Sequence, residues 1–187
     1  MGGTRCLGER GLGLRAIIGA PIILVKGGED MAKLNALYDE DFVLWTEEQA
    51  AALRRAKGSN LPLDWENLAE EIESLGKSDR RELRSQITRI LRHLLKLEAS
   101  PAAEPRAGWR ATIREARAEI EDVLEDSPSL RREVQAMITK RIRAATELAV
   151  DDLGQHRQPV NAIRTRLEKG GYTEAEVLGD WFPDEPG

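Results

Sequence analysis

Hydrophobic side chains recur every three or four positions over most of the chain after residue 37, the spacing of helices that bury one face. The first helix is predicted to begin at Asp39 or Asp41 and to end at Lys57-Gly58, a basic last turn followed by a stop signal. Its inward positions are Phe42, Trp45, Gln49, Ala52, Leu53 and Ala56.

The segment from Asp64 to Gly76 is predicted to be a short, separate, acidic helix. Pro62 disfavours helix before it, Asp64 can cap its first N–H groups, and Gly76 can adopt the left-handed conformation that ends many helices. Its apolar stripe is Trp65, Leu68, Ile72 and Leu75. Its four carboxylates, Glu66, Glu70, Glu71 and Glu73, repel one another unless cations lie nearby.

Further helices are predicted at about residues 78–97, 106–125, 127–152 and 160–169, with a last turn opened by the capping-box pattern Thr173-x-x-Glu176. Trp181-Phe182-Pro183 is expected to pack back on them. The pattern therefore predicts an all-α fold. We expect an up-down bundle of four to five main helices at residues 31–153, and a short helical C-terminal tail at 154–187 that packs on it.

Residues 1–30 follow a different pattern, rich in glycine and with one broken apolar run from Ala16 to Val25. That run is too short to span a bilayer. We expect residues 1–30 to be a disordered leader, with Met31 as the natural start. Cys6 is the single cysteine, so no internal disulfide is possible, and a cytoplasmic location is the default.

Charge is segregated along the chain, although the net charge is only −5. From Asp39 to Leu75 there are ten acidic residues against three basic ones, and from Lys77 to Arg117 eleven basic against five acidic. Because the two blocks are consecutive and both helical in pattern, we expect them to pack as antiparallel neighbours whose opposite charges pair. A basic face that binds nucleic acid is the alternative.

His93 is a candidate for chemistry, because the ordinary pKa of histidine lies near neutrality. It could act as a metal ligand or general base, or lie at the border of the apolar stripe, bonded to Glu71 or another acidic residue. A helical two-metal site needs Glu-x-x-His on two helices, and no glutamate lies three residues before His93. We therefore favour the border position, and expect no metal and no cofactor.

Arg110, Arg114 and Arg117 form one row on the helix predicted at residues 106–125. They could hold a phosphate, since a guanidinium group can donate two parallel hydrogen bonds to an anion. The alternative, which we favour, is that they pair with the acidic helix. Trp109 at the start of the same helix is expected to anchor the core. The sequence shows no nucleophile constellation, no glycine-rich phosphate loop and no paired Cys/His ligands.

Several short blocks resemble a known bacterial family, the "domain of unknown function 29". The blocks are Tyr38-Asp39-x-Asp41-Phe42-x-Leu44-Trp45, Asn67 to Gly76, His93-Leu94-Leu95-Lys96, Trp109-x-x-Thr112-Ile113-x-Glu115-x-Arg117 and Asp126-Ser127-Pro128-Ser129-Leu130. The resemblance covers about residues 37–183. It implies an all-helical, cytoplasmic, bacterial protein, and it supplies no activity.

The sequence leaves three functional hypotheses open. The first, which we favour, is an interaction or scaffold module without catalytic activity that binds a protein partner or a second copy. The second is a nucleic-acid-associated protein that uses Arg-rich helix faces. The third is a hydrolase centred on Glu70, Glu71 and His93, which requires a pocket where those side chains converge. No membrane role is expected.

Overall fold

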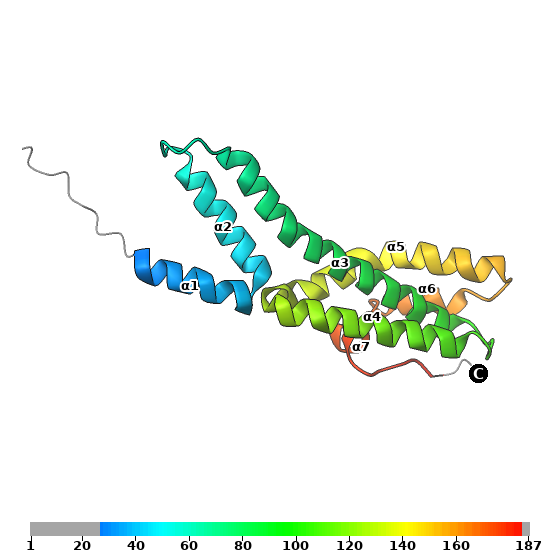
Figure 1. Ribbon diagram of the computed structural model, residues 1–187. Helices are drawn as coiled ribbons and strands as arrows, with labels where there is room; N and C mark the ends of the chain where they lie inside the picture. The colour runs from blue at the N-terminus through cyan, green and yellow to red at the C-terminus, as the bar shows by residue number, and fades with distance from the viewer. Residues whose placement is uncertain (1–26, 185–187) are drawn as a thin grey trace, which may run out of the picture.

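The computed structural model describes residues 27–184, and all regular structure within them is helical (Figure 1). The helices are α1 Gly27–Glu40, α2 Phe42–Ala56, α3 Trp65–Ala99, α4 Arg106–Asp126, the 3-10 helix η1 Pro128–Glu133, α5 Val134–Gln155, α6 Asn161–Glu168 and α7 Glu174–Leu178. The predicted all-α fold is confirmed. The expected leader at residues 1–30 lies outside the described residues except for its last four, which begin α1.

Helix α3 organises the molecule, because α2, α4, α5, α6 and α7 all pack against it. Its 35 residues span about 50 Å at 1.5 Å per residue. The C-terminal part supplies most of the core, with seven large side chains that are fully buried: Leu83, Ile87, Ile90, Leu91, Leu94, Leu95 and Leu97. Helices α4 and α5 complete this core with residues such as Ile113, Ile120 and Ile138.

Helix α2 and the first part of α3 run antiparallel and project away from the bundle formed by the rest of α3, α4 and α5 (Figure 1). We call residues 42–80 the arm. Helix α1 leaves the base of the arm, and most of its side chains from Met31 onward are exposed.

The predicted end of the acidic helix at Gly76 is wrong, because α3 continues through it. Glycine in a helix interior costs about 1 kcal/mol relative to alanine. Here the missing side chain serves helix packing, since a Cβ at Gly76 would collide with the Thr46 hydroxyl of α2. The glycine therefore marks a close helix–helix contact, and the predicted start of a new helix at about residue 78 does not exist.

Several predicted helix starts are confirmed. Asp64 caps α3 by accepting a hydrogen bond from the Asn67 N–H, and Thr173 opens α7 in a complete capping box. Asp41 caps α2 through the Leu44 N–H at 2.9 Å. Ser127-Pro128 begins η1, and only after it does α5 start.

The C-terminal segment packs on α3 and α5, with Tyr172 and Val177 buried, and it is hydrogen-bonded to Arg117 of α4. Arg166 of α6 forms ion pairs with Glu98 of α3 at 2.8 Å and Glu176 of α7 at 2.9 Å. Burial raises the pKa of the Glu98 carboxyl, although the nearby guanidinium of Arg166 opposes the shift. This buried charge network ties the tail to the bundle.

Candidate functional site

A groove lined by basic side chains runs between α3 and α5. It consists of two adjoining cavities of about 600 and 520 Å³. Its basic lining residues are Lys77, Arg80, Arg81, Arg84, Arg89 and Arg92 of α3, Arg132 of η1, and Lys140 and Arg141 of α5. Glu133 is the one acidic residue that lines these cavities in the described part of the chain, and it pairs with Arg80 at 3.3 Å. We call this surface the basic groove.

Basic residues on one side of α3 form one wall of the basic groove. Lys77, Arg81, Arg84 and Arg92 follow at intervals of four, three and eight residues, so they form one stripe along α3. The stripe is about 22 Å long at 1.5 Å per residue. Arg141 of α5 joins the walls, because its Nε donates a hydrogen bond to the Thr88 hydroxyl of α3 at 2.9 Å.

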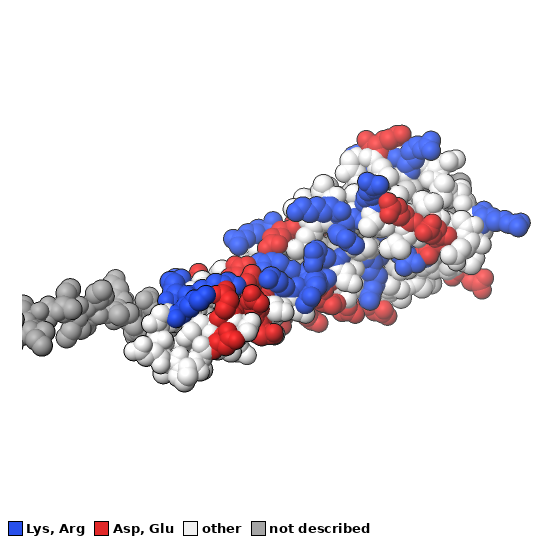
Figure 2. All heavy atoms as spheres, turned by 90° about the horizontal axis from the view of Figure 1, so that it is seen from above, with Lys and Arg blue, Asp and Glu red and all other residues white. Residues whose placement is uncertain are grey.

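Most cations of the groove have no acidic partner. Five of them form no ion pair with any residue that the structure describes: Arg81, Arg84, Arg132, Lys140 and Arg141. Figure 2 shows the result, a blue surface over the middle of the molecule, with acidic residues gathered on the arm beside it. Such a concentration of like charge is unfavourable by itself and favours a bound polyanion.

Two glutamates of the acidic segment, Glu66 and Glu73, form ion pairs within the arm. Glu66 lies 3.2 Å from Lys57 and 3.6 Å from Arg54, and Glu73 lies 2.6 Å from Arg54 and 3.3 Å from Lys77. The predicted pairing of this helix with the arginine row of α4 is therefore not formed. The reason is that α3 continues past Gly76, so that α2, and not α4, packs beside the acidic part.

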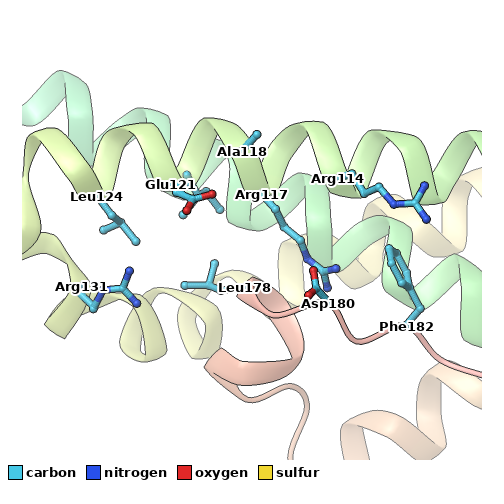
Figure 3. Close-up of a pocket in the computed structure, with 10 residues that line it drawn as sticks. Arg114, Arg117, Ala118, Glu121, Leu124, Arg131, Leu178, Asp180 and Phe182 are labelled. Atoms are coloured by element: carbon cyan, nitrogen blue, oxygen red, sulfur yellow. The ribbon is translucent and has the colours of Figure 1, made fainter.

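The arginine row of α4 instead lies against Phe182 of the C-terminal segment, and Figure 3 shows Arg114 and Arg117 beside this ring. The guanidinium carbons of Arg110, Arg114 and Arg117 lie 5.7, 5.4 and 4.8 Å from the centre of the Phe182 ring. Such contacts are cation–π interactions. A cavity of about 650 Å³ beside them is lined by basic and acidic side chains, and the acidic ones are Glu121 and Asp180.

Arg117 also holds the C-terminal segment by hydrogen bonds. It donates to the backbone carbonyl oxygens of Glu176, Val177 and Trp181 at 2.8 to 3.0 Å. Burial lowers the pKa of its guanidinium, and the neighbouring Arg114 acts in the same direction. Arg117 is thus occupied by a structural role, which leaves Arg114 as the exposed cation of the pair.

His93 lies on the buried half of α3, where its Nδ1 is buried and has no hydrogen-bond partner among the described residues. Burial lowers its pKa from 6.5 to about 4, and the cations Lys96 and Arg92 add to this shift, while Asp152 opposes it. The ring is therefore neutral at physiological pH. Neutrality suits a packing position, and it removes the proton needed for general acid catalysis near pH 7.

Lys96 and Arg92 share the carboxylate of Asp152 on α5. The Lys96 Nζ lies 2.9 Å from this carboxylate, and Arg92 donates to both of its oxygens. These hydrogen bonds lower the pKa of Asp152 to about 2. The Lys96 ammonium also lies 4.6 Å from the centre of the Trp109 ring, beside a cavity of about 440 Å³. Trp109 packs against the core, as expected.

The structure does not bring Glu70, Glu71 and His93 together. Glu71 and His93 are 22 positions apart on the one continuous helix, which corresponds to roughly 30 Å. The predicted contact between His93 and Glu71 is therefore absent, and the hydrolase hypothesis loses its site. Within residues 27–184, no group of three His, Cys, Asp or Glu side chains could hold a metal ion.

Sequence reasoning missed half of the groove. The stripe on α3 was visible in the sequence, although it was assigned to pairing with the acidic helix. Arg132, Lys140 and Arg141 were not singled out at all, because their importance depends on α5 lying beside α3. A basic cluster at positions 131, 132, 140, 141 and 143 was the available signal.

The described residues form an all-helical protein with a groove lined by basic side chains between α3 and α5. No helix in the described part of the chain has the length and hydrophobicity to cross a membrane. The chain belongs to the family described as "Domain of unknown function DUF29", whose model matches residues 37–176. The resemblance seen in the sequence is thereby confirmed.

A solved structure supports the same fold. The crystal structure of an alpha-helical protein of unknown function from Rhodospirillum rubrum is similar, with a TM-score of 0.62 and 26% sequence identity. The match covers 78% of this chain and 91% of that one. No curated protein matches the sequence.

Proposed function

We propose that the protein is a binding module, and not an enzyme, whose basic groove holds the phosphate backbone of a nucleic-acid duplex. The observation that carries this proposal is the set of five cations without ion pairs that line one groove between two packed helices. In a protein with a net charge of −5, such a local excess of positive charge requires an explanation.

The chemistry and length of the groove suit a phosphate backbone. Guanidinium groups bind phosphate oxygens with two parallel hydrogen bonds, and seven of the nine cations that line the groove are arginines. A stripe of about 22 Å matches about six nucleotides of one strand, at 3.4 Å of helix axis per nucleotide. Release of condensed counterions then drives binding.

The composition of the groove favours a duplex over a single strand. No aromatic side chain lines either of its two cavities within the described residues. Proteins that hold single strands stack exposed bases on aromatic rings, and a groove without rings cannot do so. It can contact phosphates, which supply affinity but little sequence information. We therefore propose binding that is largely independent of sequence.

This proposal keeps part of the role that the sequence favoured. The protein would act by association, as an adaptor in the bacterial cytoplasm, and the acidic arm leaves a second surface free for a protein partner. The change is that nucleic acid, which the sequence did not favour, becomes the preferred ligand of the arginine-rich faces. The reason is that the acidic helix pairs elsewhere.

Fluorescence anisotropy with duplexes and single strands of about 20 nucleotides tests this function at low salt. We expect the duplex to bind more tightly, and Arg81→Glu, Arg84→Glu and Arg141→Glu together to abolish binding. Arg164→Glu, an exposed position on α6 outside the groove, is the matched control and should have little effect. Absence of duplex binding by the wild type, or undiminished binding by the triple variant, would contradict the proposal.

A further inference from the structure

The arm has a charged edge and an apolar edge. On the charged edge, ion pairs from Arg54 to Glu66 and Glu73, and from Arg80 to Glu47, connect the two helices. Because an α-helix has 3.6 residues per turn, the apolar residues of both helices fall together on the opposite edge. These residues are Phe42, Trp45 and Ala52 of α2, and Leu68, Ile72 and Leu75 of α3. We call them the apolar face of the arm.

Large parts of this face are open to solvent. Leu68 is 41% exposed and Leu75 is 46% exposed, while the other four residues are half-buried. At the tip, Leu61 and Leu63 extend the apolar surface with exposures of 61% and 49%. Single exposed leucines are ordinary, but an apolar strip along two helices is typical of an interface.

The described residues cover only the base of this face. There, Tyr38 of α1 packs edge-on against Phe42 and Trp45, with ring centres 5.8 and 4.8 Å apart. The upper part of the arm is a single layer of two helices (Figure 1). An amphipathic helix pair normally buries its apolar side against a second layer, and the bundle supplies none there.

We propose that the apolar face binds the same face of a second copy of this chain, so that two arms form a four-helix bundle. The two-fold axis would run along the arms and place α2 of one copy against α3 of the other. A self-complementary face requires that the charges at its rim also complement each other under this rotation. The arm meets that requirement.

The charged residues at the rim of the face include a cation and an anion at similar heights along the arm. Arg55 follows the α2 side and Glu71 the α3 side; both are exposed, and neither forms an ion pair in residues 27–184. Because Arg54 reaches both Glu66 and Glu73, its neighbour Arg55 lies level with the residues between them. Rotation about an axis along the arms preserves this height. Each Arg55 would therefore meet a Glu71 of the other copy.

Sedimentation equilibrium of the full chain tests this dimer. We expect Arg55→Glu or Glu71→Arg alone to raise the dimer dissociation constant about tenfold, because each change places like charges together at two symmetric sites. The two changes combined should restore dimerisation to within about threefold of the wild type. A double variant as weak as the single ones would overturn the arrangement.

Matched controls separate the face from general effects of charge. Glu70→Arg changes the adjacent exposed glutamate, which points away from the face, and should leave dimerisation unchanged. Leu68→Glu should give a monomer with an unchanged helical circular dichroism spectrum. Leu167→Glu, at a position 38% exposed on α6, should leave the protein dimeric.

Three further outcomes would overturn the proposal. One is a wild-type protein that stays monomeric at the highest concentration reached. Another is a dimer that withstands Leu68→Glu and Glu71→Arg, since its interface must then lie elsewhere. The third is a dimer that forms only after residues 1–26 are removed, because the apolar face would then belong to that segment of the same chain.

Discussion

Gly76 of α3 lies against Thr46 of α2, so close that a Cβ at position 76 would collide with the threonine hydroxyl. Both residues are buried. The Thr46 hydroxyl is held by its own hydrogen bond to the Val43 carbonyl oxygen at 2.7 Å. The glycine therefore lets the two helices of the arm approach each other, and the threonine cannot move aside without loss of this bond.

Gly76→Ala is expected to lower the free energy of unfolding by about 1–3 kcal/mol, the usual cost of overpacking, despite alanine's higher helix propensity. Gly108→Ala is the matched control, because position 108 lies in α4 with no neighbouring atom within 4 Å of the added Cβ. It should raise stability by up to about 1 kcal/mol. Urea denaturation measures both, and equal effects would refute the packing role of Gly76.

Asp41 connects the arm to the bundle, and its removal should destabilise both. Its carboxylate caps α2 and accepts hydrogen bonds from the N–H and hydroxyl of Ser129 at 2.6 and 2.9 Å. Asp41→Ala is expected to cost about 2–4 kcal/mol, since it removes a cap and leaves the partly buried donors of Ser129 without this partner. Ser129→Ala should cost less in the same thermal or urea unfolding measurement, because the cap remains. The reverse order would contradict this account.

His93 is expected to make the protein less stable in acid. Its pKa in the folded state is about 4 against an ordinary value of 6.5, so between these values the unfolded chain binds a proton that the folded chain does not. The unfolding free energy should therefore fall as pH falls from about 6.5 to 4, by about 1–2 kcal/mol when screening of the partly exposed ring is allowed for.

His93→Leu should lack this part of the pH dependence. The comparison is made by urea unfolding of wild type and variant at several pH values between 4 and 7.5. Groups that titrate independently of His93 cancel in the difference between the two proteins. Parallel curves over this whole range would show that the folded state protonates His93 as readily as the unfolded state.

Arg117 should decide whether the C-terminal segment stays docked. Its three hydrogen bonds to backbone carbonyls have a fork geometry that lysine cannot reproduce, so Arg117→Lys is expected to cost about 1–3 kcal/mol. The fluorescence of Trp181 and faster proteolysis of the tail report the change. Arg114→Lys is the control, because Arg114 contributes a ring contact with Phe182, and it should leave the tail protected.

Local signals predicted most of the fold. The caps at Asp64 and Thr173 and the extent of α4 depend on a few neighbouring residues, and the structure has them where the sequence indicated. Gly76 was misread because the same residue ends a helix in one setting and permits close packing in another. Only the presence of Thr46 on a neighbouring helix decides between the two.

The candidate site was less predictable, because charge partners are chosen by tertiary packing. The sequence showed an acidic block and a basic block, but it could not show that Arg54 and Lys57 would satisfy Glu66 and Glu73. Once those pairs are known, the cations of α3 are left to face α5. The basic groove is thus a consequence of one continuous helix where the sequence predicted two.

The dependence of duplex binding on salt concentration tests the central claim most directly. If five cations of the groove neutralise phosphates, a plot of log K against log salt concentration should have a slope of about −4 to −5. Arg84→Gln should reduce the magnitude of this slope by about one and weaken binding to all duplex sequences alike. A slope near zero, or one that stays the same when the arginines of the groove are replaced, would contradict the account.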